Sequence, residues 1–391
     1  MVIEIGIGIS IKDDSYEAGI EAATKAINDL GWEEGDFALI FSTDKYEPEE
    51  MMKGILKIIK NIDNAGCCGG GIISENKLYN QGVQVSIIKS NELYLSSAVG
   101  LEISKDGKNA GRKVARLLLD KVKYKPFQDM KKTVILLPDG ISGNVKDIVE
   151  GAYSVLGASY ALVGGGTGDN LKFLSTFQFH NGKVFQDAAV GIIIVSKNCG
   201  RGVAHGWMPF GDPMMTSRVD GNVIKEIDGK PAIETYSNFF KKHNMDVHKD
   251  SFSRFAMEYP FGVSGIGGTY VIRDPLSIEE AGGIVCVADI PNFSMIRIMK
   301  GNKQTMKQAA YDAAERARSE FGNKKPKLLL IFDCVSRLLL LEDEAIEEIR
   351  LIKNTVGNHV KLTGFFSFGE IGSIKGKVPS FHNKSVSLLL L

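Results

Sequence analysis

The sequence has no net charge, few cysteines and no apolar run long enough to cross a membrane. Lysine and arginine together number 47, and aspartate and glutamate also number 47, so the chain lacks the positive excess of nucleic-acid-binding and membrane-surface proteins. No stretch approaches the roughly 20 apolar residues of a transmembrane helix. No basic segment precedes an apolar run at the N-terminus, as a secretory signal requires. The sequence therefore predicts a cytoplasmic, globular protein that binds neither nucleic acid nor membrane.

The cysteines and histidines do not form a recognisable bonding pattern. The five cysteines are an odd number, and no two are spaced as a CxxC pair, which excludes a disulfide framework and a zinc ribbon. The six histidines include no pair at i and i+4 on one helix and none at zinc-finger spacing from a cysteine. We therefore expect no metal site and no resident cofactor from the residues alone.

What the sequence does contain is a unit that occurs three times. Each unit has a helix, an apolar strand, a second amphipathic helix, a glycine-rich turn and a closing strand. The first helices are expected at residues 16–30, 108–122 and 302–321, and the glycine-rich turns lie at residues 66–71, 164–169 and 364–370. Strands that alternate with helices indicate an α/β protein with mixed sheets and flanking helices.

A region of different character interrupts this pattern between residues 202 and 298. Alternating apolar residues on both sides of Asp220-Gly221-Asn222 predict a β-hairpin. A helix is expected at residues 234–243, and further strands near residues 270–272, 283–288 and 295–299. We divide the 391-residue chain into two related domains, residues 1–200 with two units and residues 201–391 with the hairpin insert and the third unit.

Candidate ligand-binding side chains follow the third apolar strand. Cys334 and Arg337 come directly after it, at a strand end where a ligand crevice is expected. An arginine there can hold a carboxylate in a bidentate pair, and Glu370 in the third glycine turn can receive an ammonium group. Together they would suit an amino acid or a similar zwitterion. The alternative is that Arg337 and Glu370 pair with each other.

The glycine turns and the residues before the last strand are further candidates. Without a Cβ atom, glycine lets a ligand approach the backbone closely, but it also allows tight turns and close packing. The turns contain no GxxxxGK[ST] phosphate-binding motif. Before the last strand, an imidazole and an amide would either face the ligand or stabilise a local turn. The candidate residues in the glycine turns and before the last strand are Gly165, Gly166, Asp169, Gly364, Gly369, His382 and Asn383.

No complete set of catalytic residues is recognisable. A cysteine nucleophile needs a base, which His205 or His382 would supply to Cys334, but neither histidine belongs to a known nucleophile motif. The alternative for Cys334 is an inert thiol packed in the core. We therefore expect a binding protein rather than an enzyme.

These residues resemble the FIST family of sensory proteins in intracellular signal transduction. The N-terminal part is similar to a FIST N domain in the turn from Gly164 to Asp169. The C-terminal part is similar to a FIST C domain in Gly364-Phe-Phe-Ser-Phe-Gly-Glu370 and in His382 and Asn383. The first glycine turn departs from the family pattern, so the resemblance does not imply a ligand contact at this turn.

The resemblance implies a two-domain sensor of small ligands, with amino acids proposed for the family. It implies output through a separate signalling protein, such as a kinase, a cyclase or a chemotaxis component, because this chain reaches only the last FIST strand. Some relatives are linked to haem-based gas sensing. The alternatives are therefore a haem sensor, a cysteine-dependent enzyme that uses Cys334, and a scaffold.

Overall fold

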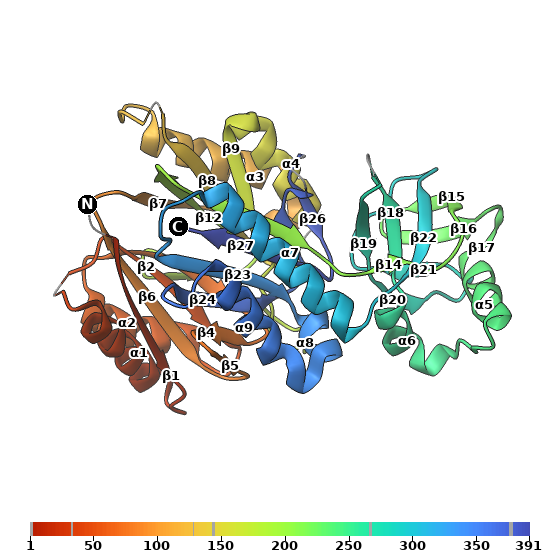
Figure 1. The fold of residues 1–391 in the computed structure, drawn as a ribbon, viewed down its shortest axis with the longest axis horizontal. Coiled ribbons are helices and arrows are strands. Elements are labelled where there is room, and N and C mark those ends of the chain that lie inside the picture. Colours follow the sequence, from red (N-terminus) through yellow and green to blue (C-terminus); the bar gives the residue numbers. More distant parts are fainter. Residues whose placement is uncertain (1–2, 33, 128, 143–144, 266–267, 375–377) are drawn as a thin grey trace.

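The chain folds into a large lobe that contains both termini and a smaller lobe beside it (Figure 1). The structure is a computed structural model, and it describes residues 3–391 except 33, 128, 143–144, 266–267 and 375–377. The three repeated units make up the large lobe. The small lobe is one continuous insertion in the third unit.

The three units of the large lobe share one order of elements, to which the third adds α8, η3 and the insertion. The first unit contains β1 (Ile3–Ser10), α1 (Ser15–Leu30), β2 (Phe37–Ser42), α2 (Pro48–Ile59), β3 (Asp63–Cys68), β4 (Ile72–Ser74), β5 (Lys77–Tyr79) and β6 (Val83–Ser90). The second contains β7 (Tyr94–Leu101), α3 (Ile103–Val122), β8 (Lys131–Pro138), α4 (Val145–Leu156), the 3-10 helix η1 (Gly157–Ser159), β9 (Tyr160–Gly165), β10 (Gln178–His180), β11 (Lys183–Phe185) and β12 (Ala188–Ser196). The third contains β13 (Gly200–Ala204), α7 (Lys303–Phe321), β23 (Leu328–Cys334), α8 (Val335–Leu341), η3 (Glu342–Glu344), α9 (Ala345–Val356), β24 (Lys361–Ser367), β25 (Glu370–Gly372), β26 (Ser380–His382) and β27 (Val386–Leu390).

The insertion lies between β13 and α7 and has its own sheet and core. Its elements are β14 (Met208–Pro209), β15 (Met214–Asp220), β16 (Val223–Ile227), β17 (Lys230–Pro231), α5 (Ala232–Lys242), η2 (Lys249–Ser251), α6 (Phe252–Glu258), β18 (Phe261–Ser264), β19 (Tyr270–Arg273), β20 (Pro275–Ile278), β21 (Ile284–Cys286) and β22 (Met295–Lys300). Aromatic side chains from α5, α6 and β18 pack into this core, among them Tyr236, Phe240 and Phe261. We call residues 207–300 the insert.

Each unit contributes four strands to one six-stranded sheet and one hairpin to the sheet of another unit. The strand orders are β1-β6-β2-β3-β10-β11, β7-β12-β8-β9-β25-β26 and β13-β27-β23-β24-β4-β5. The β4–β5 hairpin of the first unit therefore completes the third sheet, β10–β11 of the second completes the first, and β25–β26 of the third completes the second. This exchange binds the three units into a single lobe.

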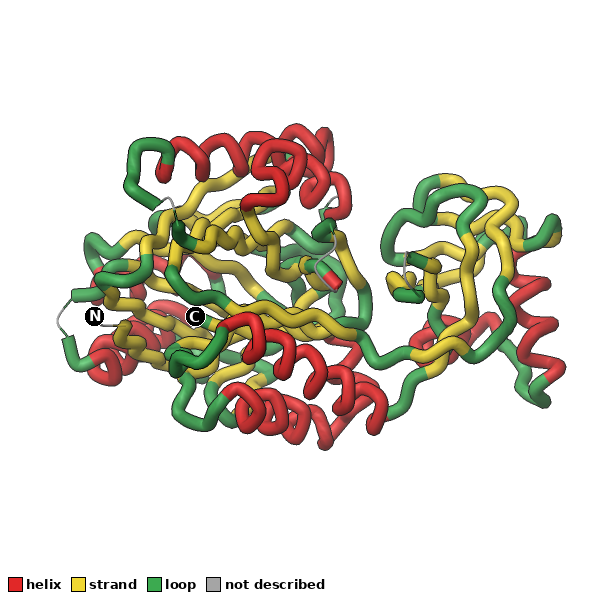
Figure 2. The backbone as a smooth tube through the Cα atoms, turned by 45° about the horizontal axis from the view of Figure 1, so that its top comes forward, coloured by secondary structure: helices red, strands yellow, loops and turns green. Residues whose placement is uncertain are grey.

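The sheets pack against one another through one face and against helices through the other (Figure 2). The shared interior contains side chains from all three sheets, including Phe41, Leu137 and Phe332. Helices α1 and α2, α3 and α4, and α7 and α9 cover the outer faces of the first, second and third sheets. The helices begin where the sequence offers caps: the Asp14 side chain accepts the Glu17 N–H, and Asn302 forms a capping box with Thr305.

Corresponding glycines in the three units allow the two parallel strands of each sheet to pack closely. Gly66 on β3, Gly164 on β9 and Gly364 on β24 lie beside Ile40, Leu136 and Ile331 of the neighbouring strand. A Cβ atom at these glycines would lie 1.7, 2.0 and 2.1 Å from the respective carbonyl oxygens. Close packing therefore requires glycine at these three places.

The fold class predicted from the sequence is confirmed: this is an α/β protein of mixed sheets, flanking helices and repeated units. The Asp220-Gly221-Asn222 hairpin and the helix after it are also found. The sequence did not predict the three exchanged hairpins, α6, or α8 directly after Cys334. The boundary placed near residue 200 falls between β12 and β13. Among the described residues, no helix is both long enough and apolar enough to span a membrane.

Candidate functional site

The three glycine-rich turns meet at one end of the large lobe. The Gly70 N–H donates to the Phe366 carbonyl, the Gly166 N–H to the Gly369 carbonyl and the Gly168 N–H to the Cys68 carbonyl. These bonds connect each turn with the other two. The turns are buried and bond to one another, so their glycines contact protein groups.

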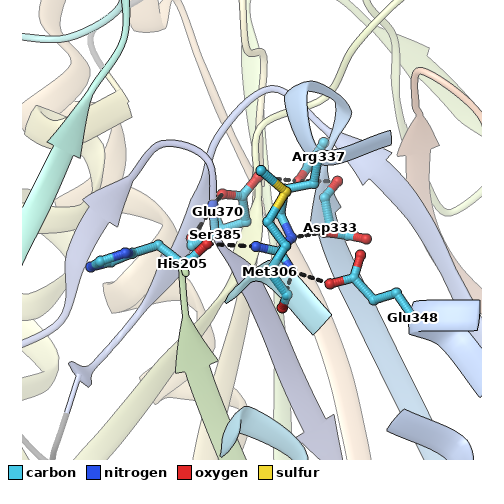
Figure 3. A network of polar contacts seen from close by, with 8 residues as sticks. His205, Met306, Asp333, Arg337, Glu348, Glu370 and Ser385 are labelled. Carbon is cyan, nitrogen blue, oxygen red and sulfur yellow. Dashed lines mark hydrogen bonds and ion pairs between the residues drawn. The ribbon is translucent and has the colours of Figure 1, made fainter. Parts of the chain in front are cut away.

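Arg337 lies fully buried at the start of α8, in the network shown in Figure 3. Its Nε atom lies 3.0 Å from the Asp333 carboxylate, and a terminal nitrogen contacts the Glu348 carboxylate. Its other donors bond to the carbonyls of His205, at 2.7 Å, and Met306, at 3.1 Å. Burial acts to lower the pKa of Arg337, but Glu348 and Asp333 outweigh it and raise that pKa.

Glu370 is also fully buried, and it bonds to hydroxyl and amide groups rather than to Arg337. Its carboxylate accepts hydrogen bonds from the Ser367 hydroxyl at 2.7 Å, the Ser385 hydroxyl at 2.8 Å and the Ser385 N–H at 2.9 Å. Burial raises the pKa of Glu370 to about 7, although these hydrogen bonds oppose the rise. Both charged groups at this strand end are therefore buried and bond to protein partners, and a ligand contact by either stays a prediction.

The other residues predicted near Arg337 are also internal. Cys334 is 4% exposed, and burial raises the pKa of its thiol to about 12. His382 is 2% exposed, its Nε2 atom lies 3.0 Å from the Ser380 hydroxyl, and burial lowers its pKa to about 4. His205 accepts the Trp207 N–H at Nδ1. Among the described residues, Cys334 has no hydrogen bond to either histidine.

The residues predicted in the second glycine turn stabilise the backbone. A Cβ atom at Gly165 would lie 2.7 Å from that of Ser367, and one at Gly166 would lie 2.5 Å from the Phe368 carbonyl oxygen. The buried Asp169 carboxylate accepts N–H groups of the loop that follows, at Phe173 and Leu174. The buried Asn383 lies beside His382, near Glu370. A ligand-contact role for these residues stays a prediction.

A cavity of about 760 Å³ lies at the junction of the second and third sheets. Its walls come from β9, from the start of β13, from the last turns of α7 and from the ends of the β25–β26 connection. Among the described residues, its polar side chains come from seven: Tyr153, Tyr160, Arg201, Arg316, Ser319, Glu320 and Ser373. None belongs to a motif singled out in the sequence, because the seven come from widely separated elements.

The charged groups of the cavity include one arginine without a carboxylate partner in the described structure. Arg201 pairs with Glu320, its Nε atom 3.0 Å from Oε1. Among the described residues, Arg316 donates to the Val203 carbonyl, at 3.0 Å, and to no carboxylate. The cavity therefore has two guanidinium groups and one carboxylate, a balance that favours a ligand with at least one negative charge.

The cavity and the Arg337 network are connected through β13. Arg201 and Val203 on this strand line the cavity, and the His205 carbonyl just beyond it accepts the Arg337 bond. The insert begins two residues later, at Trp207. The chain returns from the insert into α7, which carries Arg316 and Glu320. Both connections of the insert therefore join elements that also line the cavity, α7 through its last turns.

The described residues contain no group of three or more histidine, cysteine, aspartate or glutamate side chains placed to hold a metal ion. Haem iron is most often held by histidine, cysteine or methionine. None of these is among the described residues that line the cavity. The lining offers tyrosine, a less common haem ligand, but none of these three, and no haem chemistry is assigned to it.

Glu370 predicts a pH dependence of stability. Its pKa is about 7 in the native protein against 4.5 for an ordinary glutamate, so the native protein retains a proton that the unfolded chain has released. The free energy of unfolding therefore falls as the pH rises from about 4.5 to about 7, by up to about 3 kcal/mol. Glu370→Gln keeps the shape without the charge, and Gln178 occupies the corresponding position in the first sheet.

Urea unfolding of both proteins at pH 5 and pH 8 measures this effect. We expect the wild type to lose about 2 to 3 kcal/mol more than Glu370→Gln between the two pH values. The histidines and surface groups are the same in both proteins, so their contribution cancels. Equal losses would show that Glu370 is ionised throughout this range.

Comparison with known proteins gives matches along most of the chain. A family model described as the FIST N domain matches residues 36–230, and one described as the FIST C domain matches residues 232–373. The uncharacterized protein MJ1623 of Methanocaldococcus jannaschii is 26% identical over 322 residues, 77% of this chain and 60% of that protein. The uncharacterized protein Rv0628c of Mycobacterium tuberculosis is 21% identical over 397 residues, 99% of each chain. The chain thus spans less than two thirds of the first relative and nearly all of the second.

Similarity to solved structures is weaker. A chorismatase crystal structure aligns over the whole of both chains with a TM-score of 0.39 and 6% identity. A cyanuric acid hydrolase aligns with 50% of this chain and 72% of its own, with a TM-score of 0.29 and 9% identity. Neither similarity is strong enough to assign chemistry. The resemblance noted in the sequence is confirmed by the two family models.

Proposed function

Because the chain belongs to the FIST family, we propose that it is a sensory protein that binds a small metabolite in the cavity between β9, β13 and α7. The metabolite is of the amino-acid class, with one carboxylate and one ammonium group. The output passes to a separate signalling protein, such as a kinase, a cyclase or a chemotaxis component. This proposal moves the ligand from Arg337 and Glu370 to Arg316 and Glu320.

The proposal rests on one observation: Arg316 and Glu320 both lie on the α7 wall of a cavity whose size suits a small metabolite. Ligand pockets commonly measure about 300 to 1,000 Å³, and this cavity measures about 760 Å³. The planar guanidinium of Arg316 can hold a carboxylate through two parallel hydrogen bonds. Glu320 already accepts four hydrogen bonds from Arg201, so it would attract the ammonium group by its negative charge rather than through a free acceptor site.

The position of the cavity supports a sensory role. A ligand that bonds to α7 and β13 contacts both elements from which the insert is suspended. It would shift the insert only if it binds one arrangement of these elements more tightly than another. The insert is the part of the chain most separate from the repeated units, so its surface is where we place the contact with the output protein.

A thermal-shift screen with the amino acids tests the proposal. A ligand at 100 times its dissociation constant should stabilise the protein by about 2.7 kcal/mol, which gives a measurable rise in Tm. Arg316→Gln removes the contact with the ligand carboxylate. It should lower the affinity for the amino acid found in the screen about tenfold to 100-fold, because a charged hydrogen bond contributes about 1.5 to 3 kcal/mol. Arg318→Gln is the matched control, since Arg318 lies on the same helix but bonds to the Gly322 carbonyl.

The proposal fails if no amino acid raises the Tm of the wild-type protein. It also fails if Arg316→Gln and Arg318→Gln respond equally to the hit, because the ligand would then bind elsewhere.

A further inference from the structure

The exchanged hairpins show how the chain itself fills two sites that correspond to the cavity. In the first sheet, Asn181 follows β10 and bonds to Asn64 on the edge of β3. The Asn181 N–H donates to the Asn64 carbonyl at 2.8 Å, and the Asn181 side-chain oxygen accepts the Asn64 N–H at 3.1 Å. One residue thus satisfies both backbone groups of the strand edge, with its own N–H and its own side-chain oxygen.

The third sheet repeats this arrangement with a different residue. Glu75 follows β4, its N–H donates to the Leu362 carbonyl at 3.0 Å, and its carboxylate accepts the Leu362 N–H at 3.2 Å. The second carboxylate oxygen of Glu75 contacts Lys353 on α9. Glu75 and Asn181 both adopt a left-handed backbone, with φ of 52° and 46°. The two sites therefore use the same geometry and the same pair of chemical groups.

The corresponding residue of the second sheet is Leu162 on β9. Leu162 pairs with Val134 of the neighbouring parallel strand, as Asn64 pairs with Ala38 and Leu362 with Leu329. Each of these three residues lies two positions before the close-packing glycine of its own strand. Backbone groups alternate sides along a strand, so the N–H and C=O of Leu162 point to the same side as those of Gly164, which pairs with Ile371 of β25.

At Leu162, no described residue of the hairpin bonds to the N–H or the carbonyl of the strand edge. The first two hairpins connect their strands through residues 75–76 and 181–182, whereas β25 and β26 are connected through residues 373–379. Ser373 occupies the position of Glu75 and Asn181 but has no hydrogen bond to Leu162 in the described structure, and both residues line the cavity. The cavity therefore lies where the other two sheets hold an internal Asn or Glu side chain.

We propose that the ligand supplies the two groups that Asn181 and Glu75 supply elsewhere, which narrows it to amino acids with a side-chain oxygen: aspartate, asparagine, glutamate and glutamine. Its ammonium group donates to the Leu162 carbonyl and is attracted by the negative charge of Glu320. Its side-chain oxygen accepts the Leu162 N–H. Its α-carboxylate is then held by Arg316. This inference rests on the proposed function and specifies the ligand within it.

One further contact fits this arrangement. Tyr153 on α4 lines the cavity, and α4 covers the second sheet as α9 covers the third. Its hydroxyl can donate to the second side-chain oxygen of the ligand, the role that Lys353 has for Glu75. The Tyr153 hydroxyl is neutral and can both donate and accept hydrogen bonds, so it suits a side-chain amide and a side-chain carboxylate equally.

Calorimetric titration with matched pairs of amino acids tests this inference. Glutamine is compared with methionine and asparagine with leucine, because the members of each pair have similar sizes but only one has a side-chain oxygen. We expect the oxygen-bearing member of at least one pair to bind about tenfold tighter or more, since its partner leaves the buried Leu162 N–H without an acceptor. Equal affinities within both pairs would overturn the inference and leave the proposed function standing.

A variant at Ser373 gives a second test. Ser373→Asn introduces the side chain that closes the site in the first sheet, and asparagine tolerates the left-handed backbone that Asn181 adopts in that sheet. We expect this variant to bind the ligand about tenfold more weakly or worse, while Ser373→Ala stays within about threefold of the wild type. Unchanged binding by Ser373→Asn would contradict the inference. Failure of every amino acid to bind the wild type would overturn the proposed function as well.

Discussion

Replacing Arg337 with methionine should destabilise the protein by about 3 to 5 kcal/mol, which is among the largest effects of any single substitution. The guanidinium is fully buried and pairs with Asp333 and Glu348, which are also buried. Without it, two carboxylates remain in the interior without a positive partner. Urea unfolding of the wild type and of Arg337→Met measures the loss.

The double variant Arg337→Met with Glu348→Gln is the control for this explanation. Glu348→Gln alone should destabilise the protein because it breaks the ion pair. In the Arg337→Met background it should stabilise the protein, because it removes a charge without a partner. If Glu348→Gln is destabilising in both backgrounds, repulsion between the buried carboxylates is not the cause of the loss. Arg337 would then act through packing.

Replacing Lys384 with methionine should loosen the contact between the insert and the large lobe, and cost about 3 to 5 kcal/mol. Lys384 is fully buried and lies 2.9 Å from the Asp274 carboxylate, which belongs to the insert. Asp274 also bonds to Ser336 of the large lobe at 3.4 Å. The Lys384 ammonium lies 5.5 Å from the centre of the Trp207 ring, where the insert begins.

Limited proteolysis followed by mass spectrometry measures this loosening. We expect faster cleavage of Lys384→Met in the two connections of the insert, near residues 205–207 and 301–302. Lys303→Met is the matched control: Lys303 pairs with Glu342 at the surface, where an ion pair contributes about 0 to 1 kcal/mol. Equal cleavage of the wild type and Lys384→Met would show that this ion pair does not hold the insert in place.

Local patterns in the sequence were sufficient to predict the repeated units. The helix that begins after Asn302 and the hairpin at Asp220-Gly221-Asn222 follow from capping, periodicity and turn residues within a few positions of each other. The exchange of hairpins between sheets could not be predicted in this way. It depends on pairing between strands that are distant in the sequence, such as β4 with β24.

The site was harder to predict for the same reason. The sequence shows Arg337 and Glu370 near strand ends, but their burial follows from α8, α9 and the last strand, which supply Glu348 and Ser385. Arg316 and Glu320 look like ordinary polar residues of a surface helix. The one available signal was the unequal spacing of the hairpins, since residues 373–379 form a longer connection than residues 75–76 or 181–182.

Hydrogen exchange of the backbone amides with and without the hit from the amino-acid screen tests the central claim most directly. A ligand in the cavity should slow exchange in β9 around Leu162 and in β13 around Val203, because both strands line it. Protection of these two strands, absent in Arg316→Gln, is the result that we predict. Protection confined to other strands, or no protection at saturating ligand, would contradict a ligand site between β9, β13 and α7.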